Sequence, residues 1–265
     1  MKRLVDNLLH LNNLRKITGF GIFKKAIESK LKLEFLKKPI SGNVLVISPH
    51  PDDDIFGLGG TLKIHSENKD KIKIVYISDG SGGISNNKTQ SKKLLEIRKN
   101  EAKQACKILG INDLYFMNLK DGKFTQSFDN TKKIEKIITI FKPNIIYTPS
   151  FLDIHPDHVE SANILAKALE KNNNFNGEIF SYEIWSPIFI NRLINIDKQK
   201  NIKIKAIRAH KSQLASRDYE NAILSLNQYR AKMFGFGNYA EGFLSTNKKL
   251  FLELTNLINN FGENI

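Results

Sequence analysis

The stretch Val44–Asp54, which reads VLVISPHPDDD, decides how the rest of the chain is interpreted. Its first residues are apolar and mostly β-branched, which is typical of a strand buried on both faces. The strand ends in one imidazole and three successive carboxylates, with Gly57, Gly59 and Gly60 just beyond them. Without a cation these groups would repel one another and would be costly to desolvate. The stretch therefore predicts metal-binding side chains at a strand end, the alternative being a solvated aspartate-rich turn.

A second cluster repeats this chemistry about one hundred residues later. The run Asn144–Thr148 has the composition of another buried strand, and Asp153–His158 follows it with the sequence DIHPDH. Two strand ends of one sheet can converge on a single ion. Two imidazole nitrogens and one carboxylate, with a position left for water, form the donor set of a catalytic zinc site. The single cysteine, Cys106, excludes a thiolate site.

Short β-rich runs alternate with longer amphipathic stretches through most of the chain, which specifies βαβ units. We expect a Rossmann-like α/β fold: a mostly parallel sheet, helices on both faces, and the active site at the carboxyl ends of the strands. The expected strands are Val44–Ser48, Ile72–Ser78, Leu114–Met117, Asn144–Thr148, Ile179–Trp185 and Arg192–Ile196. The expected helices are Gly60–Glu67, Ser91–Leu109, Thr131–Phe141, Pro156–Lys171, Ile204–Ser216 and Tyr219–Met233.

Length and composition agree with a globular protein. The 265 residues are 41% hydrophobic and 26% charged, and no apolar run is long enough to span a membrane. One cysteine cannot form an intramolecular disulfide, and the first residues lack the apolar segment of a secretory signal. We therefore expect a cytoplasmic protein. No repeat or low-complexity linker divides residues 41–265, which we interpret as a single domain.

The basic charge is unevenly distributed. The chain holds 41 basic and 27 acidic residues, a net charge of +14, and its pI is about 9.6. Residues 1–40 hold ten basic and three acidic residues, so 10 − 3 = +7 lies in this segment. Leu4, Leu8 and Leu11 recur there at helical spacing with basic residues among them. The segment is interpreted as a basic amphipathic helical extension that can lie on an anionic membrane at its inner face, or can pack on the domain or on another subunit.

The two clusters together resemble the motifs of the PIG-L/LmbE-like family of metal-dependent de-N-acetylases, which includes the deacetylases of glycosylphosphatidylinositol, mycothiol and bacillithiol synthesis. The carrying motifs are PHPDD at Pro49–Asp53 and HPDH at His155–His158, and the resemblance runs from about residue 43 to residue 245. Supporting matches are DGSGG at Asp79–Gly83, Arg98–Glu101 with Ala105 and Leu109–Gly110, HKSQ at His210–Gln213, and YAEGF at Tyr239–Phe243.

This resemblance implies roles for the three polar residues of the first motif and for one histidine of the second. His50 and Asp53, together with His158 from the second motif, would bind Zn²⁺, with another divalent metal such as Fe²⁺ as the alternative. Asp52 would be the general base that deprotonates the metal-bound water. A metal lowers the pKa of bound water and polarises a carbonyl, so an amide can be cleaved without a covalent intermediate.

The resemblance also implies roles outside the metal ligands. His155 would polarise the developing oxyanion or protonate the leaving amine, and Asp157 would orient the His155 imidazole. Arg98 would help to hold a sugar substrate, the alternative being an exposed charge on a helix. The motif departs from the family where Asp54 stands in place of the usual glutamate.

The expected function is a metal-dependent hydrolase that removes the acetyl group of an N-acetylated amino sugar of the GlcNAc type, free or attached to a glycan or lipid carrier. The alternative is a zinc amidase acting on a non-sugar N-acyl substrate. A nucleic-acid partner is not expected, because carboxylates gathered at strand ends repel phosphates and no helix-turn-helix, zinc-finger or RNP signature is present. A dinucleotide enzyme is excluded because HPDD, not GxGxxG, follows the first strand. The oligomeric state is left open.

Overall fold

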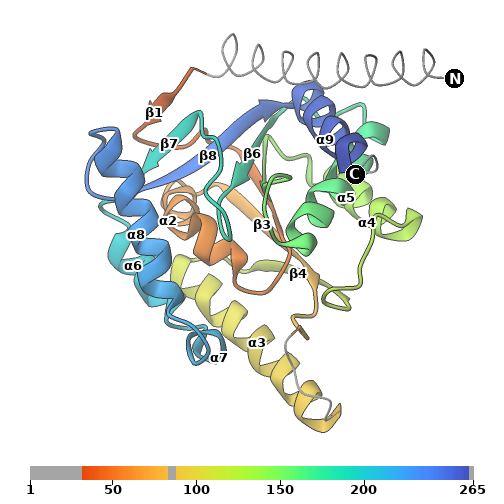
Figure 1. The fold of residues 1–265 in the computed structure, drawn as a ribbon, viewed down its shortest axis with the longest axis horizontal. Helices are drawn as coiled ribbons and strands as arrows, with labels where there is room; N and C mark the ends of the chain where they lie inside the picture. Colours follow the sequence, from red (N-terminus) through yellow and green to blue (C-terminus); the bar gives the residue numbers. More distant parts are fainter. Residues whose placement is uncertain (1–31, 83–87, 263–265) are drawn as a thin grey trace, which may run out of the picture.

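The computed structural model describes residues 32–82 and 88–262, and it places the strands of this part of the chain in one eight-stranded sheet (Figure 1). The spatial order is β1-β7-β8-β6-β5-β2-β3-β4. All neighbouring strands are parallel except β8, which runs antiparallel to β6 and β7. The strands are β1 (Glu34–Leu36), β2 (Asn43–Ser48), β3 (Lys71–Ser78), β4 (Asp113–Leu119), β5 (Ile145–Pro149), β6 (Glu178–Tyr182), β7 (Arg192–Asn195) and β8 (Ala240–Asn247).

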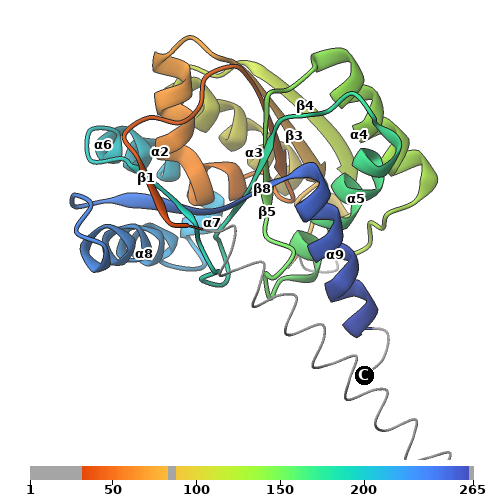
Figure 2. The same ribbon diagram turned by 90° about the horizontal axis from the view of Figure 1, so that it is seen from above.

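Helices cover both faces of this sheet (Figure 2), so the expected mostly parallel α/β fold is confirmed. One face carries α2 (Asp53–Glu67), α3 (Lys88–Leu109) and α6 (Lys200–Ile207). The other carries α4 (Phe128–Phe141), α5 (Pro156–Lys171) and α9 (Lys248–Gly262). The remaining helices are α7 (Lys211–Leu214) and α8 (Tyr219–Met233). No helix in the described ranges combines the length and the apolar composition that crossing a membrane requires.

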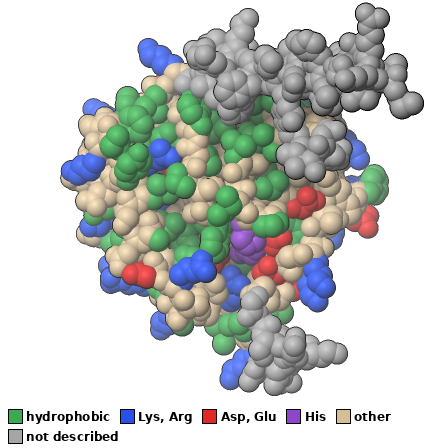
Figure 3. Space-filling model, in the orientation of Figure 1, with side chains coloured by type: hydrophobic (Ala, Val, Ile, Leu, Met, Phe, Trp, Pro, Cys, Tyr) green, Lys and Arg blue, Asp and Glu red, His purple; other side chains and the backbone are tan. Residues whose placement is uncertain are grey.

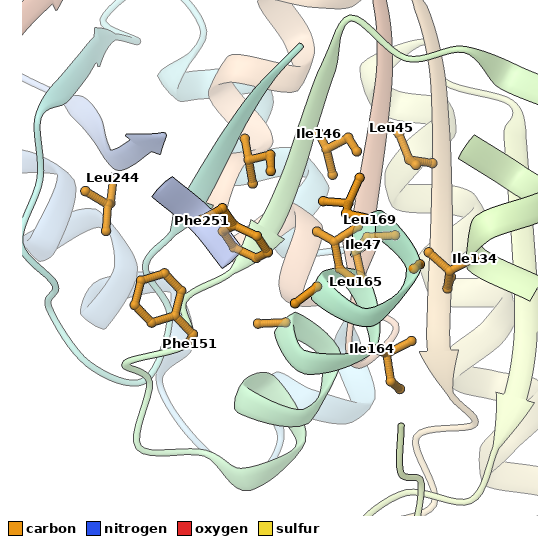
Figure 4. Close-up of a cluster of buried hydrophobic side chains, with 14 of the residues drawn as sticks. Leu45, Ile47, Ile134, Ile146, Phe151, Ile164, Leu165, Leu169, Leu244 and Phe251 are labelled. Atoms are coloured by element: carbon orange, nitrogen blue, oxygen red, sulfur yellow. The ribbon is translucent and has the colours of Figure 1, made fainter. Parts of the chain in front are cut away.

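Strand β2 lies near the middle of the sheet and is buried on both faces. Leu45 and Ile47 point into the cluster formed with α4, α5 and α9 (Figure 4). Val44 and Val46 point into the opposite cluster, formed with α2, α3 and α6. Each of these side chains contributes about 1.5–3 kcal/mol of burial free energy, and alternate residues of a strand point to opposite faces. The buried strand therefore holds the residues that follow it in a fixed place.

Helix α2 begins at Asp53, seven residues before the expected start at Gly60. Within this helix the backbone leaves helical geometry at Leu58, with φ −143° and ψ 22°, just before the expected start. The helix resumes because the Glu241 carboxylate, from β8, accepts hydrogen bonds from the backbone N–H groups of Gly60 (2.8 Å) and Thr61 (2.7 Å). A carboxylate 180 residues away thus caps the second part of α2.

The single helix expected at Ile204–Ser216 is wrong, because the chain forms α6 and α7 with a break between them. His210 has the non-helical backbone angles φ −83° and ψ 58°, and its side chain is buried against the ring of Phe56. The chain turns at His210, where the ring is buried. The first hydrogen bonds of α7 run from the backbone N–H groups of Gln213 and Leu214 to the His210 carbonyl oxygen.

Strand β1 and the pair β8 and α9 were not expected from the sequence. Strand β1 lies at the sheet edge and pairs with β7, so the described part of segment 1–40 contains a strand where a helical extension was expected. The rest of that prediction, residues 1–31, lies outside the described residues. Strand β8 is placed between β6 and β7 by pairing with residues about fifty to seventy positions away, which no local pattern encodes.

Candidate active site

A cavity of about 330 Å³ opens where the expected site lies, beyond the carboxyl ends of β2, β3, β4, β5 and β6. Its walls combine acidic, imidazole and aromatic side chains, and they include candidates from both motifs. The lining residues are His50, Asp52, Asp53, Phe56, Gly82, Arg98, Asp121, His155, Ile184, Trp185, Gln213 and Tyr219. The two motifs, separated by more than one hundred residues, therefore meet at one edge of the sheet.

Local backbone features fix both motifs. After β2, the Ser48 hydroxyl donates to the His50 carbonyl at 2.7 Å and accepts the Asp54 N–H at 3.2 Å, which shapes the turn that presents the first motif. After β5, His155 is the N-cap of α5 and Pro156 occupies its first turn. Proline suits that position because the first N–H groups of a helix have no partner in the helix.

Three predicted metal ligands converge on one point. Asp53 Oδ2 lies 2.9 Å from His50 Nδ1 and 3.2 Å from His158 Nε2. One donor atom from each residue can be chosen so that all three lie within 4.8 Å of one another, and all three residues are buried. His158 Nε2 has no hydrogen-bond partner among the described residues, because its contact with Asp53 lacks hydrogen-bond geometry. A buried nitrogen without a partner, aimed at a carboxylate and a second imidazole, fits a metal cation.

The other nitrogen of each imidazole contacts a further carboxylate. His50 Nε2 lies 3.1 Å from Asp157 Oδ2, and His158 Nδ1 lies 3.1 Å from Asp153 Oδ2. Such carboxylates orient metal-binding histidines and make them better ligands. Asp153 was missed in the sequence, although it stands within the DIHPDH stretch, five residues before His158.

Asp157 differs from its expected role. Its carboxylate contacts His50 and accepts the Gly122 N–H at 2.9 Å, whereas its backbone N–H donates to His155 Nδ1 at 3.2 Å. The backbone of Asp157 thus holds the His155 ring. Because Nδ1 accepts a hydrogen bond, a neutral His155 carries its proton on Nε2. Burial, with the neighbouring His158 and His50, lowers the pKa of His155 and favours this neutral form.

The electrostatics of the cluster favour positive charge at its centre. Burial alone would lower the pKa of both imidazoles, but the surrounding carboxylates together outweigh it. Asp53 and Asp153 raise the pKa of His158 to about 9, and Asp53, with Asp121 and Asp157, raises the pKa of His50 above its usual value. Burial likewise works against ionised Asp53, yet His158 and His50 hold its pKa well below the usual range. The negative charge of the buried carboxylates therefore favours the protonated form of the imidazoles. A divalent cation would balance the same negative charge.

Asp52 and Arg98 form a pair beside this cluster. Arg98 Nη2 lies 3.3 Å from Asp52 Oδ2, and Arg98 Nη1 donates to the Gly80 carbonyl at 2.5 Å. Burial raises the pKa of Asp52 to about 6, while the Arg98 charge opposes the rise. The structure therefore brings Arg98 to the cavity, but its guanidinium contacts Asp52 directly.

Three further cavity residues were not singled out in the sequence. Asp121 follows β4, and its Oδ1 lies 3.5 Å from His50 Nε2. Trp185 follows β6, and its ring centroid lies 5.6 Å from that of His155. Tyr219, at the start of α8, packs edge-on against Trp185. The position of Asp121 and Trp185 just after strand ends was a signal that could have found them, because ligands bind at those ends. Tyr219 gave no such signal.

The chain matches known proteins over the same region. Residues 45–169 match the family model described as PIG-L, GlcNAc-PI de-N-acetylase. The chain is 30% identical over 191 residues to the probable N-acetyl-alpha-D-glucosaminyl L-malate deacetylase 2 of Bacillus subtilis, with 64% of this chain and 83% of the relative covered. The chain belongs to the PIG-L family. This confirms the resemblance drawn from the two motifs, and the family match contains both of them.

Two further relatives extend the PIG-L match to most of the chain. The diacetylchitobiose deacetylase of Thermococcus kodakarensis is 28% identical over 245 residues, covering 84% of this chain and 91% of the relative. The solved N,N'-diacetylchitobiose deacetylase of Pyrococcus horikoshii has the same fold, with a TM-score of 0.71, 24% identity, and coverage of 87% and 94%. The PIG-L family and these relatives are N-deacetylases, and family members depend on a metal.

Proposed function

We propose that the protein is a zinc-dependent N-deacetylase that hydrolyses the acetamide of a GlcNAc-type amino sugar. The observation that carries the proposal is the meeting of His50, Asp53 and His158, with Asp52 lining the same cavity. The proposal is also supported by the relatives, whose names specify diacetylchitobiose and N-acetylglucosaminyl malate as substrates.

His50 Nδ1, an oxygen of Asp53 and His158 Nε2 would hold the metal. Two nitrogens and one carboxylate are the donors of catalytic zinc sites that keep one position for water or substrate. When bound, the metal supplies Lewis acidity for the acetyl carbonyl and lowers the pKa of water. Asp157 and Asp153 would keep the two imidazoles in their binding orientation.

Asp52 would accept the proton of the attacking water. Its raised pKa, about 6, places it closer to neutral pH than an exposed aspartate, and a general base works best when its pKa lies near the operating pH. Arg98 would hold the carboxylate in place and keep it ionised at neutral pH. This is a positioning role for Arg98, in place of the direct sugar contact implied by the resemblance.

His155 would stabilise the oxyanion that forms when water adds to the acetyl carbonyl. With its proton on Nε2, the neutral ring can donate a hydrogen bond to the oxyanion. The leaving amine can then take the proton that Asp52 removed from the water, so the His155 ring keeps its own proton. Trp185 and Tyr219 form an aromatic wall beside it that can pack against the apolar face of a sugar ring.

The test is a screen of N-acetylated sugars, glycosides and lipid-linked sugars, together with non-sugar N-acetyl amines, for released acetate. The full chain is loaded with zinc, then chelated, then reloaded with zinc or Fe²⁺. Acetate release from amino sugars that is lost on chelation and restored by zinc is the expected result. Release only from non-sugar amides would favour the amidase alternative, and release that is insensitive to chelation would contradict a metal mechanism.

We also propose that the enzyme is cytoplasmic and that its basic segment 1–40 makes peripheral contact with the anionic inner face of the membrane. The +7 charge of the segment supports this, because each basic residue near an anionic surface contributes about 1 kcal/mol. Replacing Lys2, Lys16, Lys24, Lys25 and Lys30 with glutamine in the full chain should weaken co-sedimentation with anionic vesicles. Equal sedimentation of both proteins would end this part of the proposal.

A further inference from the structure

Exposed apolar side chains gather where β1, the end of α8 and the loop between β6 and β7 meet, at the upper left of Figure 3. Large apolar side chains that are exposed together on one face indicate an interaction site, whereas single ones need no explanation. We call this group the apolar face. Its members and their exposed fractions are Phe35 (46%), Phe189 (40%), Tyr229 (53%), Met233 (63%) and Phe234 (40%).

Specific contacts join the parts of the apolar face. The ring centroid of Phe35, from β1, lies 6.4 Å from that of Phe234, which follows α8. Arg230 of α8 pairs with the buried Glu183 and donates to the Ile188 carbonyl at 2.8 Å, which fixes the loop residue next to Phe189 against the helix. The buried ion pair between Arg230 and Glu183 therefore fixes the β6–β7 loop, which carries Phe189, against α8.

Positive charge surrounds the apolar face. Lys32, Lys37, Lys38 and Lys232 are exposed on the elements that form it. The acidic residue of β1, Glu34, lies 3.5 Å from the Arg192 guanidinium and is thereby neutralised. Residues 1–31, which precede Lys32 in the sequence, hold seven basic and two acidic residues. Aromatic and aliphatic side chains with lysines around them are the composition of surfaces that bind the interface of anionic membranes.

We propose that the apolar face docks on an anionic lipid bilayer, with its aromatic side chains in the headgroup region and its lysines on the lipid charges. A second copy of the chain or residues 1–31 would bring further positive charge to a rim that is already basic, whereas an anionic bilayer complements both the apolar surface and the charge. The proposal stands independently of the chemistry of the cavity.

The docked orientation has a consequence for the cavity. The loop between β6 and β7 supplies Trp185 to the cavity wall and Phe189 to the apolar face. Figure 3 shows hydrophobic side chains at the upper left of the view and a histidine side chain near its middle, so both are visible from one direction. Docking of Phe189 would therefore hold the loop that carries Trp185, and with it this wall of the cavity, near the membrane surface.

The first test measures binding of the full chain to vesicles of phosphatidylcholine with about 30% phosphatidylserine. Tyr229→Ser with Met233→Ser, on α8, should weaken binding about tenfold, which corresponds to about 1.4 kcal/mol of binding free energy. Phe35→Ser with Phe234→Ser should do the same. The matched control is Phe128→Ser with Ile140→Ser on α4, two residues that are 65% and 69% exposed but lie outside the face.

A second measurement separates docking of the face from a tether. On addition of vesicles, the tryptophan emission of Phe234→Trp should shift to the blue and be quenched by brominated phosphatidylserine. For Phe128→Trp, the shift and the quenching should be no larger than those of the native Trp185 alone. Equal vesicle binding by all the serine variants, or equal quenching of the two tryptophan variants, would overturn the proposal. So would a dimer in solution that the face variants dissociate while vesicle binding is unchanged.

Discussion

Two buried charged clusters contact helix α2, and they differ in whether their polar atoms are satisfied. After the kink at Leu58, the Glu241 carboxylate accepts hydrogen bonds from the backbone N–H groups of Gly60 and Thr61. It also accepts one from the Lys203 ammonium (2.6 Å), which donates a second hydrogen bond to Asn227 (2.9 Å). At the first turn, Asp53 lies between two imidazoles, and His158 Nε2 has no hydrogen-bond partner among the described residues. The first cluster is complete without a ligand, whereas the second is completed by a cation. Burial of charge by itself therefore does not mark a site. What marks this one is an unpartnered imidazole nitrogen that lies within a cluster of three possible metal donors.

The largest effect should follow removal of a ligand from the incomplete cluster. His158→Ala deletes one of three metal donors, so bound zinc should be lost and acetate release should fall by more than about 10³-fold, as when a group that stabilises transition-state charge is removed. Metal content by mass spectrometry and activity check this. A His158→Ala protein that keeps stoichiometric zinc would contradict the assignment.

Asp52→Asn should lower acetate release by about 10²- to 10⁴-fold, the usual contribution of a general base, because an amide cannot accept the proton of water. Zinc content should stay the same, since Asp52 is not among the three converging donors. Metal analysis beside steady-state kinetics distinguishes this variant from His158→Ala. Full activity would show that another group is the base.

In the complete cluster, Glu241→Gln should destabilise the fold by about 3–5 kcal/mol, because it leaves the Lys203 ammonium buried without a counter-ion. The folded protein should still bind zinc, which separates this cluster from the metal site. Urea unfolding measures the loss. Lys203→Met together with Glu241→Gln should recover part of the stability, and the absence of any recovery would argue that the charge pair is not the cause.

A smaller effect is expected for the carboxylate behind His158. Asp153→Asn removes the charge that orients the ring through Nδ1, so zinc affinity should fall about 10- to 100-fold while the three donors remain. Competition with a chelator of known affinity measures the change. The exposed Asp129→Asn, on α4 and outside the lining of the cavity, is a control that should leave the affinity unchanged.

The smallest effect at neutral pH concerns His210, a buried imidazole outside both clusters. Burial, helped by the Arg98 charge, lowers its pKa to about 3, so the folded protein keeps it neutral. The unfolded chain takes up a proton below about pH 6.5, so stability should fall by about 1.4 kcal/mol per pH unit as the pH drops from 6.5 towards 3. His210→Gln should show a flatter pH dependence in urea unfolding. An unchanged slope would mean that His210 does not titrate on unfolding.

Local patterns were enough to predict most of the parallel sheet. The strands around Val44–Ser48 and Asn144–Thr148 are continuous apolar runs, and the helix at Pro156–Lys171 has a proline in its first turn and an amphipathic repeat. These signals lie within a few residues of the element that they specify. The kink in α2 and the break at His210 were mispredicted because Glu241 and the packing of Phe56, distant in the chain, decide them.

The same division holds for the candidate site. The sequence places His50 and Asp53 after one buried strand and His155 and His158 after another. A parallel sheet brings such ends to one edge, and the donor chemistry then indicates a metal, while the choice of His158 as the second imidazole ligand came from the family resemblance. Only the tertiary structure decides that Asp157 and Asp153 each take one imidazole and that Arg98 contacts Asp52. It also adds β1 and β8 to the sheet. The physical reason is that strand periodicity and donor type are local properties, whereas the pairing of side chains and of edge strands depends on contacts between residues far apart in the chain.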